Sequence, residues 1–396
     1  MPTDRAVRLL VAAVASLSLS QSVAAQGTAP PSSPRGQLLV FGTPLLAGQA
    51  MSALASIASL EVSTAPLGTS TGGFTFTFDP QVRAWTRSAS SFGPSFAERS
   101  LTTGRGKVSA GFNWLHADYD SFNGQDLHNF EFQPAQNAVG LPGSPIHSAV
   151  AMNFTSETIV AYGHVGVTNN LDVGVAVPWI RTTLDAEGQV VSGGGQLLGV
   201  FELPEISASG VGDVAIFGKY QFFRQDAGGA AVAVELRLPT GDRNAFRGLD
   251  ITRTLVSGIW SHGGRVSPHA NVGYEFWSDE VAISASGDVF AKNQYKYAVG
   301  VELEAHPRAT VVLDLVGRGL RNGGKVAYQT FPGVLPGTAV DALVGVGEGV
   351  HQVAFAPGVK WNTVGSFLLT GNVLLSLSNS GLRANVIPVV GIDWAF

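Results

Sequence analysis

Acidic and basic side chains stand at every second position in several otherwise apolar runs of the sequence. In residues 292–305, for example, Lys296, Glu302 and Glu304 share one parity, and tyrosines, valines and a leucine occupy the other. The residues placed in this way are seven acids, seven bases and one histidine: Asp213, Lys219, Glu235, Arg237, Arg265, His269, Glu275, Lys296, Glu302, Glu304, Asp314, Arg318, Lys360, Arg383 and Asp393. Equal numbers of opposite charges favour mutual ion pairs and hydrogen bonds over selection of ions of one sign. Direct contact with a substrate is the alternative role.

Residue spacings typical of enzymes and of metal or phosphate sites are scarce. The sequence has no HExxH and no GxSxG, and GRGK at residues 104–107 lacks the first glycine and the Ser or Thr of a phosphate-binding loop. Residues 118–124, DYDSFNG, resemble a calcium loop, but Phe122 occupies a ligand position and the glycine comes one place late, so a divalent ion there stays a weak alternative. Four histidines have no partner at a catalytic spacing: His116, His128, His147 and His164. We therefore predict no cofactor and no metal, and a hydrolase is the weakest functional alternative.

The composition argues against a soluble nucleic-acid-binding protein. Only 13% of the 396 residues are charged, compared with about 25% in ordinary soluble proteins. The net charge is −5 and the sequence has no basic cluster, whereas phosphate binding needs a face rich in Lys and Arg. The chain has no cysteine, so packing or closure of a sheet must stabilise it without disulfides.

The first 25 residues predict a secretory signal peptide. Arg5 and Arg8 begin it, an apolar run spans residues 6–19, and Val23 and Ala25 supply the small residues of a cleavage site. We expect residues 1–25 to be removed on export.

The elements that must position the charged set are β-strands. After residue 105 the sequence consists of runs of about 10 to 14 residues with a period of two, at which side chains fall on opposite faces of a strand. We predict twelve strands, at residues 106–118, 156–167, 171–184, 212–224, 230–240, 252–261, 265–277, 292–305, 309–320, 351–362, 366–378 and 382–396.

The connections between these strands alternate between short and long. Residues 168–170 form a short connection, and the long ones include 119–155, 185–211 and 321–350, although the last turn, residues 379–381, is short where a long loop is expected. Short turns on one side and long loops on the other are typical of an outer-membrane barrel, with the turns in the periplasm.

The predicted fold class is therefore all-β, an antiparallel transmembrane β-barrel of the cell outer membrane formed by residues 105–396. Because an Arg or Lys on the lipid face costs about 2–4 kcal/mol at mid-depth, the apolar faces should meet lipid and the fifteen polar residues above should line the lumen. A soluble sandwich or lipocalin-like barrel is the alternative, since alternation alone does not distinguish them.

Residues 26–104 leave the content of the lumen open. They comprise a Pro/Ser/Gly-rich linker at residues 26–36, an Ala-rich run at 38–60 that predicts a short helix, and one or two short strands within 72–87. This segment either enters the lumen as a plug or adds a strand pair at the seam, which would raise the strand number to 14. A twelve-stranded barrel is wider than one filled by its own side chains and narrower than an open porin. Whether solutes pass through it therefore depends on what occupies the lumen.

Two segments carry a family resemblance. Gly210, Gly212 and Asp213, followed by LPTGD at residues 238–242, together with NNLDVGVAVPWI at residues 169–180, resemble the outer-membrane transporters of the phenol meta-pathway degradation family. The resemblance covers residues 105–396 and implies an outer-membrane barrel that admits small hydrophobic or aromatic compounds. Pro239 also ends ladder hydrogen bonding and the next residues suit an open turn, which is a sufficient structural role for LPTGD.

The functional hypothesis is a passive channel in which a small hydrophobic or aromatic solute enters among the long loops. A structural or adhesive barrel without transport is the alternative, and an outer-membrane hydrolase is the second.

The C-terminal residues predict one more partner. Apolar residues alternate up to Trp394, and the sequence stops at Phe396. This pattern resembles the signal by which the barrel-assembly machinery takes up outer-membrane proteins, and the unpaired edge of a last strand offers backbone groups for such recognition. The expected partners are outer-membrane lipid, this machinery and the solute, and no nucleic acid.

Overall fold

The computed structural model describes residues 31–45, 47–66, 73–79, 81, 83–132, 146–192, 194–225, 227–284, 289–332 and 339–396. The predicted signal peptide, residues 1–25, lies outside the described residues.

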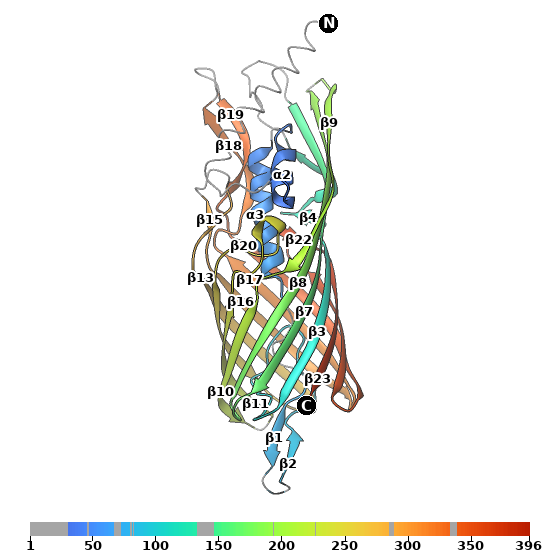
Figure 1. Cartoon of the computed structure of the whole chain (residues 1–396), viewed down its shortest axis with the longest axis vertical. Coiled ribbons are helices and arrows are strands. Elements are labelled where there is room, and N and C mark those ends of the chain that lie inside the picture. Colours follow the sequence, from blue (N-terminus) through green and yellow to red (C-terminus); the bar gives the residue numbers. More distant parts are fainter. Residues whose placement is uncertain are drawn as a thin grey trace.

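Twelve antiparallel strands close into a barrel, which confirms the predicted fold class (Figure 1). They are β3 (Val108–Asp118), β7 (Ile146–Gly166), β8 (Leu171–Ser192), β10 (Ala215–Gln225), β11 (Gly228–Arg237), β12 (Arg253–Ser261), β13 (Val266–Trp277), β16 (Gln294–His306), β17 (Ala309–Leu320), β20 (Val350–Val364), β21 (Phe367–Ser376) and β23 (Val386–Ala395). The last strand, β23, pairs with the first, β3, with Val389 opposite Leu115. Closure pairs the backbone groups that an edge strand would leave open.

The ring holds twelve strands, and the alternative number of fourteen does not describe it. The three-residue β6 (Phe130–Phe132) pairs with β7, and the longer β9 (Leu197–Val211) pairs with β8, so both extend the sheet beyond the ring. Before the barrel in the sequence, β1 (Phe76–Asp79) and β2 (Ala84–Arg87) pair with each other and, within the described part of the chain, with no barrel strand.

The outer face of the ring is apolar and the inner face is polar. Along β23, Asp393 is buried, while its neighbours Ile392 and Trp394 are exposed. Large outward side chains on other strands are exposed as well, such as Phe222, with an exposed fraction of 63%, and Trp361. A soluble sandwich or lipocalin-like barrel would turn these side chains inward, so the outer surface suits lipid hydrocarbon instead.

The predicted long loops contain further strands, so their boundaries are wrong. Beyond Trp179, β8 continues with the polar Asp185 and Glu187 facing outward and the apolar Leu184 and Ala186 facing inward. The apolar face changes sides because the strand leaves the apolar belt and packs on helices. A strand with polar residues outward and apolar residues inward does not match the pattern expected of a lipid-facing strand, so the sequence alone predicts a loop for this part of β8.

The end of the barrel toward which β8 continues beyond Trp179 is called here the hairpin end. Shorter elements lie at this end. They are β4 (Ser121–Phe122), β5 (Gln125–Asp126), η1 (Leu127–Asn129), η2 (Arg243–Ala245), β14 (Val281–Ala282), β15 (Phe290–Ala291), β18 (Lys325–Pro332), β19 (Ala339–Val346) and β22 (Leu382–Arg383). The opposite end, called the turn end, carries the short connections, the β1–β2 hairpin and the chain's last residue (Figure 1).

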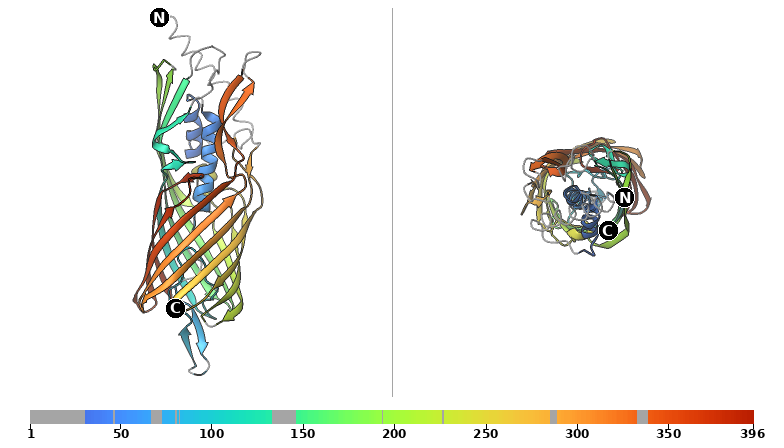
Figure 2. Two further views of the ribbon diagram at one scale, coloured as in Figure 1. Left: turned by 180° about the vertical axis from the view of Figure 1, so that it is seen from behind. Right: turned by 90° about the horizontal axis from the view of Figure 1, so that it is seen from above.

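Two helices lie inside the ring near the hairpin end, α2 (Pro34–Gly42) and α3 (Gly48–Thr64), as the view from above shows (Figure 2). The Ser33 side chain caps α2 by accepting from the backbone N–H of Gly36 at 3.1 Å. A Cβ at Gly188 of β8 would lie 2.7 Å from the Leu45 side chain, so this glycine makes room for the helix pair. Within the described residues, neither helix is long and apolar enough to cross a membrane.

Candidate functional site

Two segments lie in the lumen, and a chamber between them is lined by residues of both. The upper plug is α2 and α3, and the lower plug is the extended segment of residues 88–104 near the turn end. The wall holds both plugs through inward polar side chains.

Asp314 is the centre of the attachment of the lower plug. Its Oδ2 accepts hydrogen bonds from the backbone N–H groups of Ser95 (3.0 Å) and Phe96 (2.9 Å). Its Oδ1 lies 2.7 Å from Nε2 of His269, which fixes the carboxylate. Lys360 Nζ donates to the carbonyl oxygen of Pro94 at 2.6 Å. An extended segment in a lumen has backbone groups without ladder partners, and these contacts satisfy them.

Contacts of the same kind continue along the rest of the lower plug. Gly93 N–H donates to Glu302 at 3.0 Å, and Lys219 Nζ donates to the carbonyl oxygen of Arg99 at 3.1 Å. Burial lowers the pKa of the Arg99 guanidinium, and the negative charges of Glu302 and Glu98 act against this shift. These inward side chains of the wall therefore bind the chain's own plug.

Two arginines hold the C-terminal end of α3. Arg237 Nη1 and Arg253 Nη2 both donate to the carbonyl oxygen of Ser63, at 3.1 and 3.0 Å. The last carbonyls of a helix lack intrahelical donors and carry the negative end of the helix dipole, so guanidinium groups stabilise them. Arg253 also donates to Asp213 Oδ2 at 2.9 Å. Its side chain lies 3.7 Å from Glu275.

A third contact fixes the same helix to two further strands of the wall, β17 and β20. Glu61 of α3 forms an ion pair with Arg318 and accepts from Gln352 Nε2 at 3.0 Å. The lower half of the chamber thus faces the lower plug, and the upper half faces a helix end bonded to the wall.

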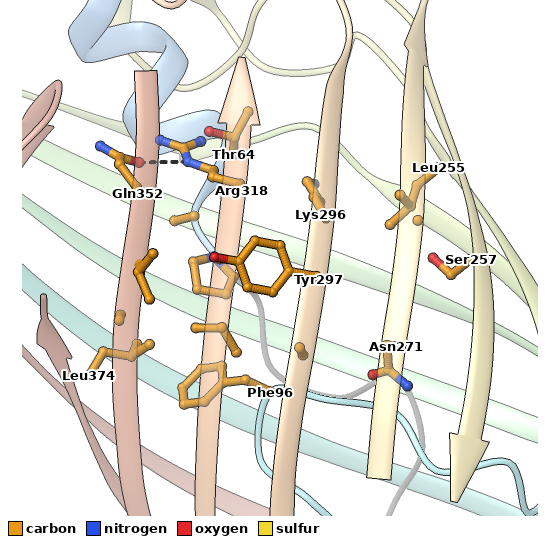
Figure 3. A pocket seen from close by; sticks show the side chains of 18 of the residues that line it. Thr64, Phe96, Leu255, Ser257, Asn271, Lys296, Tyr297, Arg318, Gln352 and Leu374 are labelled. Carbon is orange, nitrogen blue, oxygen red and sulfur yellow. Dashed lines mark hydrogen bonds between the residues drawn. The ribbon is translucent and has the colours of Figure 1, made fainter. Parts of the chain in front are cut away.

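The chamber has a volume of about 260 Å³, below the roughly 300–1,000 Å³ of sites for drug-sized ligands. Charged and amide side chains line its upper end: Glu61, Glu235, Arg237, Lys296, Arg318, Gln352 and Arg383. Glu98 and Asn271 are the charged and amide exceptions in the remainder, and apolar side chains line most of it: Phe96, Phe217, Leu255, Ile259, Ala298, Val316 and Leu374. Figure 3 shows Arg318 and Gln352 at one end and Leu374 and Phe96 at the other. The chamber therefore fits a small solute with an apolar body.

The structure places the predicted lumen residues in four groups. Those that contact the lower plug, directly or through Asp314, are Lys219, His269, Glu302, Asp314 and Lys360. Those in the ionic network beside the upper plug are Asp213, Glu235, Arg237, Glu275, Lys296 and Arg318. Asp393 is buried and accepts from the Tyr162 hydroxyl, and Glu304 is half-buried near the end of β16. Arg265 is exposed on a turn, and Arg383 lies on β22 in the loop before β23.

Sequence reasoning missed several polar residues of the site. Arg253 is the one charged side chain on the inward face of β12 and stands at the first residue of the strand, so no repeat of charged positions marks it. Glu61 and Arg99 lie before the barrel, where no period marks an inward side. Asp172 accepts from the Thr103 N–H at 2.8 Å. The alternation with Val173 could have identified Asp172.

Of the other candidates, the three histidines with described side chains do not line the chamber, whereas Tyr119 of the segment 118–124 does. His128 is exposed beside Asp126, His116 lies 3.8 Å from Glu157, and His164 is buried. The side chain of His147 lies outside the described residues. In the segment 118–124, Asp120 accepts from the backbone N–H of Asn385 at 2.7 Å.

Trp394 and Phe396 lie on the outer face at the turn end. Both are exposed, and their ring centroids are 5.0 Å apart. The Phe396 backbone exchanges two hydrogen bonds with Val108, both of 2.9 Å, so this residue also closes the ring.

Residues 128–378 match the model of the family described as "Putative MetA-pathway of phenol degradation". No curated protein matches the sequence. An outer membrane channel from Pseudomonas putida F1 superposes with a TM-score of 0.48 at 12% identity, covering 75% of this chain and 98% of that chain. The Ralstonia pickettii toluene transporter TbuX gives 0.33 at 11% identity, with coverage of 85% and 100%. The Pseudomonas putida toluene transporter TodX gives 0.34 at 9%, with 74% and 90%. These likenesses are too distant to identify a substrate, so the barrel is established by the chain's own strand pairing.

Proposed function

From the premise that the chain belongs to the family described as "Putative MetA-pathway of phenol degradation", whose model spans more than half of it, we propose that it is a passive outer-membrane channel for small hydrophobic or aromatic compounds. Residues 1–25 would direct export, residues 26–104 would supply the plugs, and residues 105–396 would form the barrel, with the turn end in the periplasm. The observation that carries the proposal is the partly apolar chamber inside a ring whose outer face is apolar.

The chamber explains how such a solute would pause on its way across the barrel. A ring-shaped solute would lie against Phe96, Phe217 and Leu374, away from water on most sides. Movement follows the gradient. Because a plug lies on each side of the chamber, passage requires that the plugs yield in turn.

A sealed barrel with a structural or adhesive role is the second candidate. The observation that favours it is the attachment of both plugs to the wall by buried hydrogen bonds, such as those of Asp314 and Arg253. Such a barrel would pass no solute.

Uptake by intact cells separates the two candidates. Cells that express the chain should take up a labelled neutral aromatic such as benzyl alcohol faster than cells without it, and the initial rate should rise in proportion to the outside concentration. Equal rates in both kinds of cell, with folded protein present in the outer membrane, would favour the sealed barrel.

A further inference from the structure

We propose that the chamber prefers aromatic solutes that carry a negative charge, and that Arg383 binds the anionic group. This inference rests on the proposed function and specifies its substrate class.

Five of the bases in and behind the chamber wall have a carboxylate partner. The pairs are Arg237 with Glu235, Arg253 with Asp213, Lys296 with Glu275, Arg318 with Glu61, and Lys219 with Glu98. Arg383 is the sixth base, and no carboxylate of the described residues comes within 4.0 Å of it. The group therefore carries one positive charge in excess, at a known side chain.

Neutral acceptors hold the guanidinium of Arg383 in place. Its Nε donates to Ser121 Oγ at 3.2 Å, and its Nη1 donates to the Ser378 carbonyl oxygen and to Asn379 Oδ1, both at 2.6 Å. Its Nη2 donates to no protein acceptor in the described parts of the chain. A fixed, half-buried guanidinium with one free nitrogen is well suited to bind a carboxylate.

The position of Arg383 also decides how a solute would lie. Arg383 lines the chamber together with Gln352, whose Nε2 donates to the carbonyl oxygen of Leu382 at 3.2 Å, so both belong to the polar upper end. Phe96 and Leu374 lie at the other end (Figure 3). An aromatic carboxylate would place its charged group at Arg383 and its ring between these apolar side chains.

An unpaired charge, whether cation or anion, is unfavourable in a site that is largely removed from water, and pairing with an opposite charge offsets this cost. A neutral aromatic fits the apolar part of the chamber but leaves the charge of Arg383 without a partner. The structure thus favours the anion over the neutral compound without excluding the latter.

The test compares two solutes with the same ring. Binding of benzoate and of benzyl alcohol to the folded full chain in detergent at pH 7.5 is measured by calorimetry. We expect benzoate to bind more tightly. The Arg383→Gln variant should lose about tenfold of benzoate affinity, the effect of one lost charge-assisted hydrogen bond, and keep its affinity for benzyl alcohol. Arg383→Lys should retain part of the preference, and Arg321→Gln, at an exposed arginine outside the chamber, should change neither affinity.

Several outcomes would overturn the inference. One is equal affinity of the unchanged protein for both solutes, and another is full benzoate affinity in folded Arg383→Gln, with folding checked by heat-dependent gel mobility. Butyrate, which has the charge without the ring, should bind more weakly than benzoate, and equal binding would show that the aromatic half is wrong. Uptake by cells distinguishes the two proposals. If cells take up benzyl alcohol at least as fast as benzoate, the channel function is supported and the preference for anions is wrong. Uptake of neither solute contradicts the channel itself.

Discussion

Arg237 and Arg253 converge on one carbonyl oxygen, that of Ser63 at the end of α3. Asp213 holds Arg253 from the wall side, so the arginine links strand β12 to the upper plug. Both side chains of this pair are buried. Removal of one partner of a buried ion pair leaves an uncompensated charge and costs about 3–5 kcal/mol.

The substitution Arg253→Met should therefore lower the free energy of unfolding by about 3–5 kcal/mol, measured in denaturant titrations of protein in lipid vesicles. Arg265→Met is the matched control, because Arg265 is exposed on a turn and should change stability little. Equal stability of the two variants would show that Arg253 does not fasten the upper plug.

For a single residue, the sequence predicts whether its side chain faces inward or outward from the barrel wall, but not which residue it contacts. Parity along β17 indicates that Asp314 faces inward, and the structure buries it. Its partners, the N–H groups of Ser95 and Phe96, lie more than 200 positions earlier in the chain. No local pattern encodes such a pairing, so the sequence does not show that Asp314 binds the lower plug.

At the scale of elements, the lower plug is the segment whose movement matters most for passage. Ser100 and Ser261 of β12 face each other with their hydroxyl oxygens 2.7 Å apart, and the natural chain has no cysteine. This pair offers a way to lock the segment to the wall.

The double substitution Ser100→Cys and Ser261→Cys should form a disulfide on oxidation, because the two side chains are already in contact. After treatment with an oxidant, cells that express this variant should take up benzyl alcohol several-fold more slowly than untreated cells, because the disulfide holds the lower plug against the wall. A reductant should restore the rate. Ser100→Cys alone should respond to neither treatment. Unchanged uptake by the fully oxidised variant would show that solutes leave the chamber without moving this segment.

Along β8 the apolar side chains face outward up to Trp179 and inward beyond it, and this change explains which elements could be predicted from the sequence. Within the apolar belt the period of two marks the strand, with Trp179 outward. Beyond it the strand packs against α2 and α3, so the helices decide which face is apolar. The sequence also does not show whether residues 26–104 enter the lumen or add strands to the wall. An irregular segment has no period, and its partners are distant residues that it meets only in the folded barrel.

At the scale of the whole molecule, the chain's last residue takes part in closing the ring. The Phe396 backbone pairs with Val108, while its ring lies exposed beside Trp394. Deletion of Phe396 would remove both features together, so a side-chain substitution is the cleaner test of the proposed assembly signal.

Phe396→Ala should lower the amount of protein inserted in the outer membrane several-fold at equal expression, with the binding of solutes by the inserted fraction unchanged. Phe222→Ala, which removes another exposed outward ring, is the control and should leave insertion nearly unchanged. If both variants insert like the unchanged chain, the terminal ring is not read during assembly.

Two neighbouring residues of β12 test most directly whether a small aromatic solute crosses the barrel through the chamber between the two plugs. Ser257 lines the chamber, whereas Val256 is exposed on the outer face. Uptake of labelled benzyl alcohol by intact cells should fall at least several-fold in Ser257→Trp, because the indole fills a large part of a chamber of about 260 Å³. It should stay unchanged in Val256→Trp, which puts the same ring into lipid. Equal uptake by the two variants, both folded and inserted, would contradict passage through the chamber.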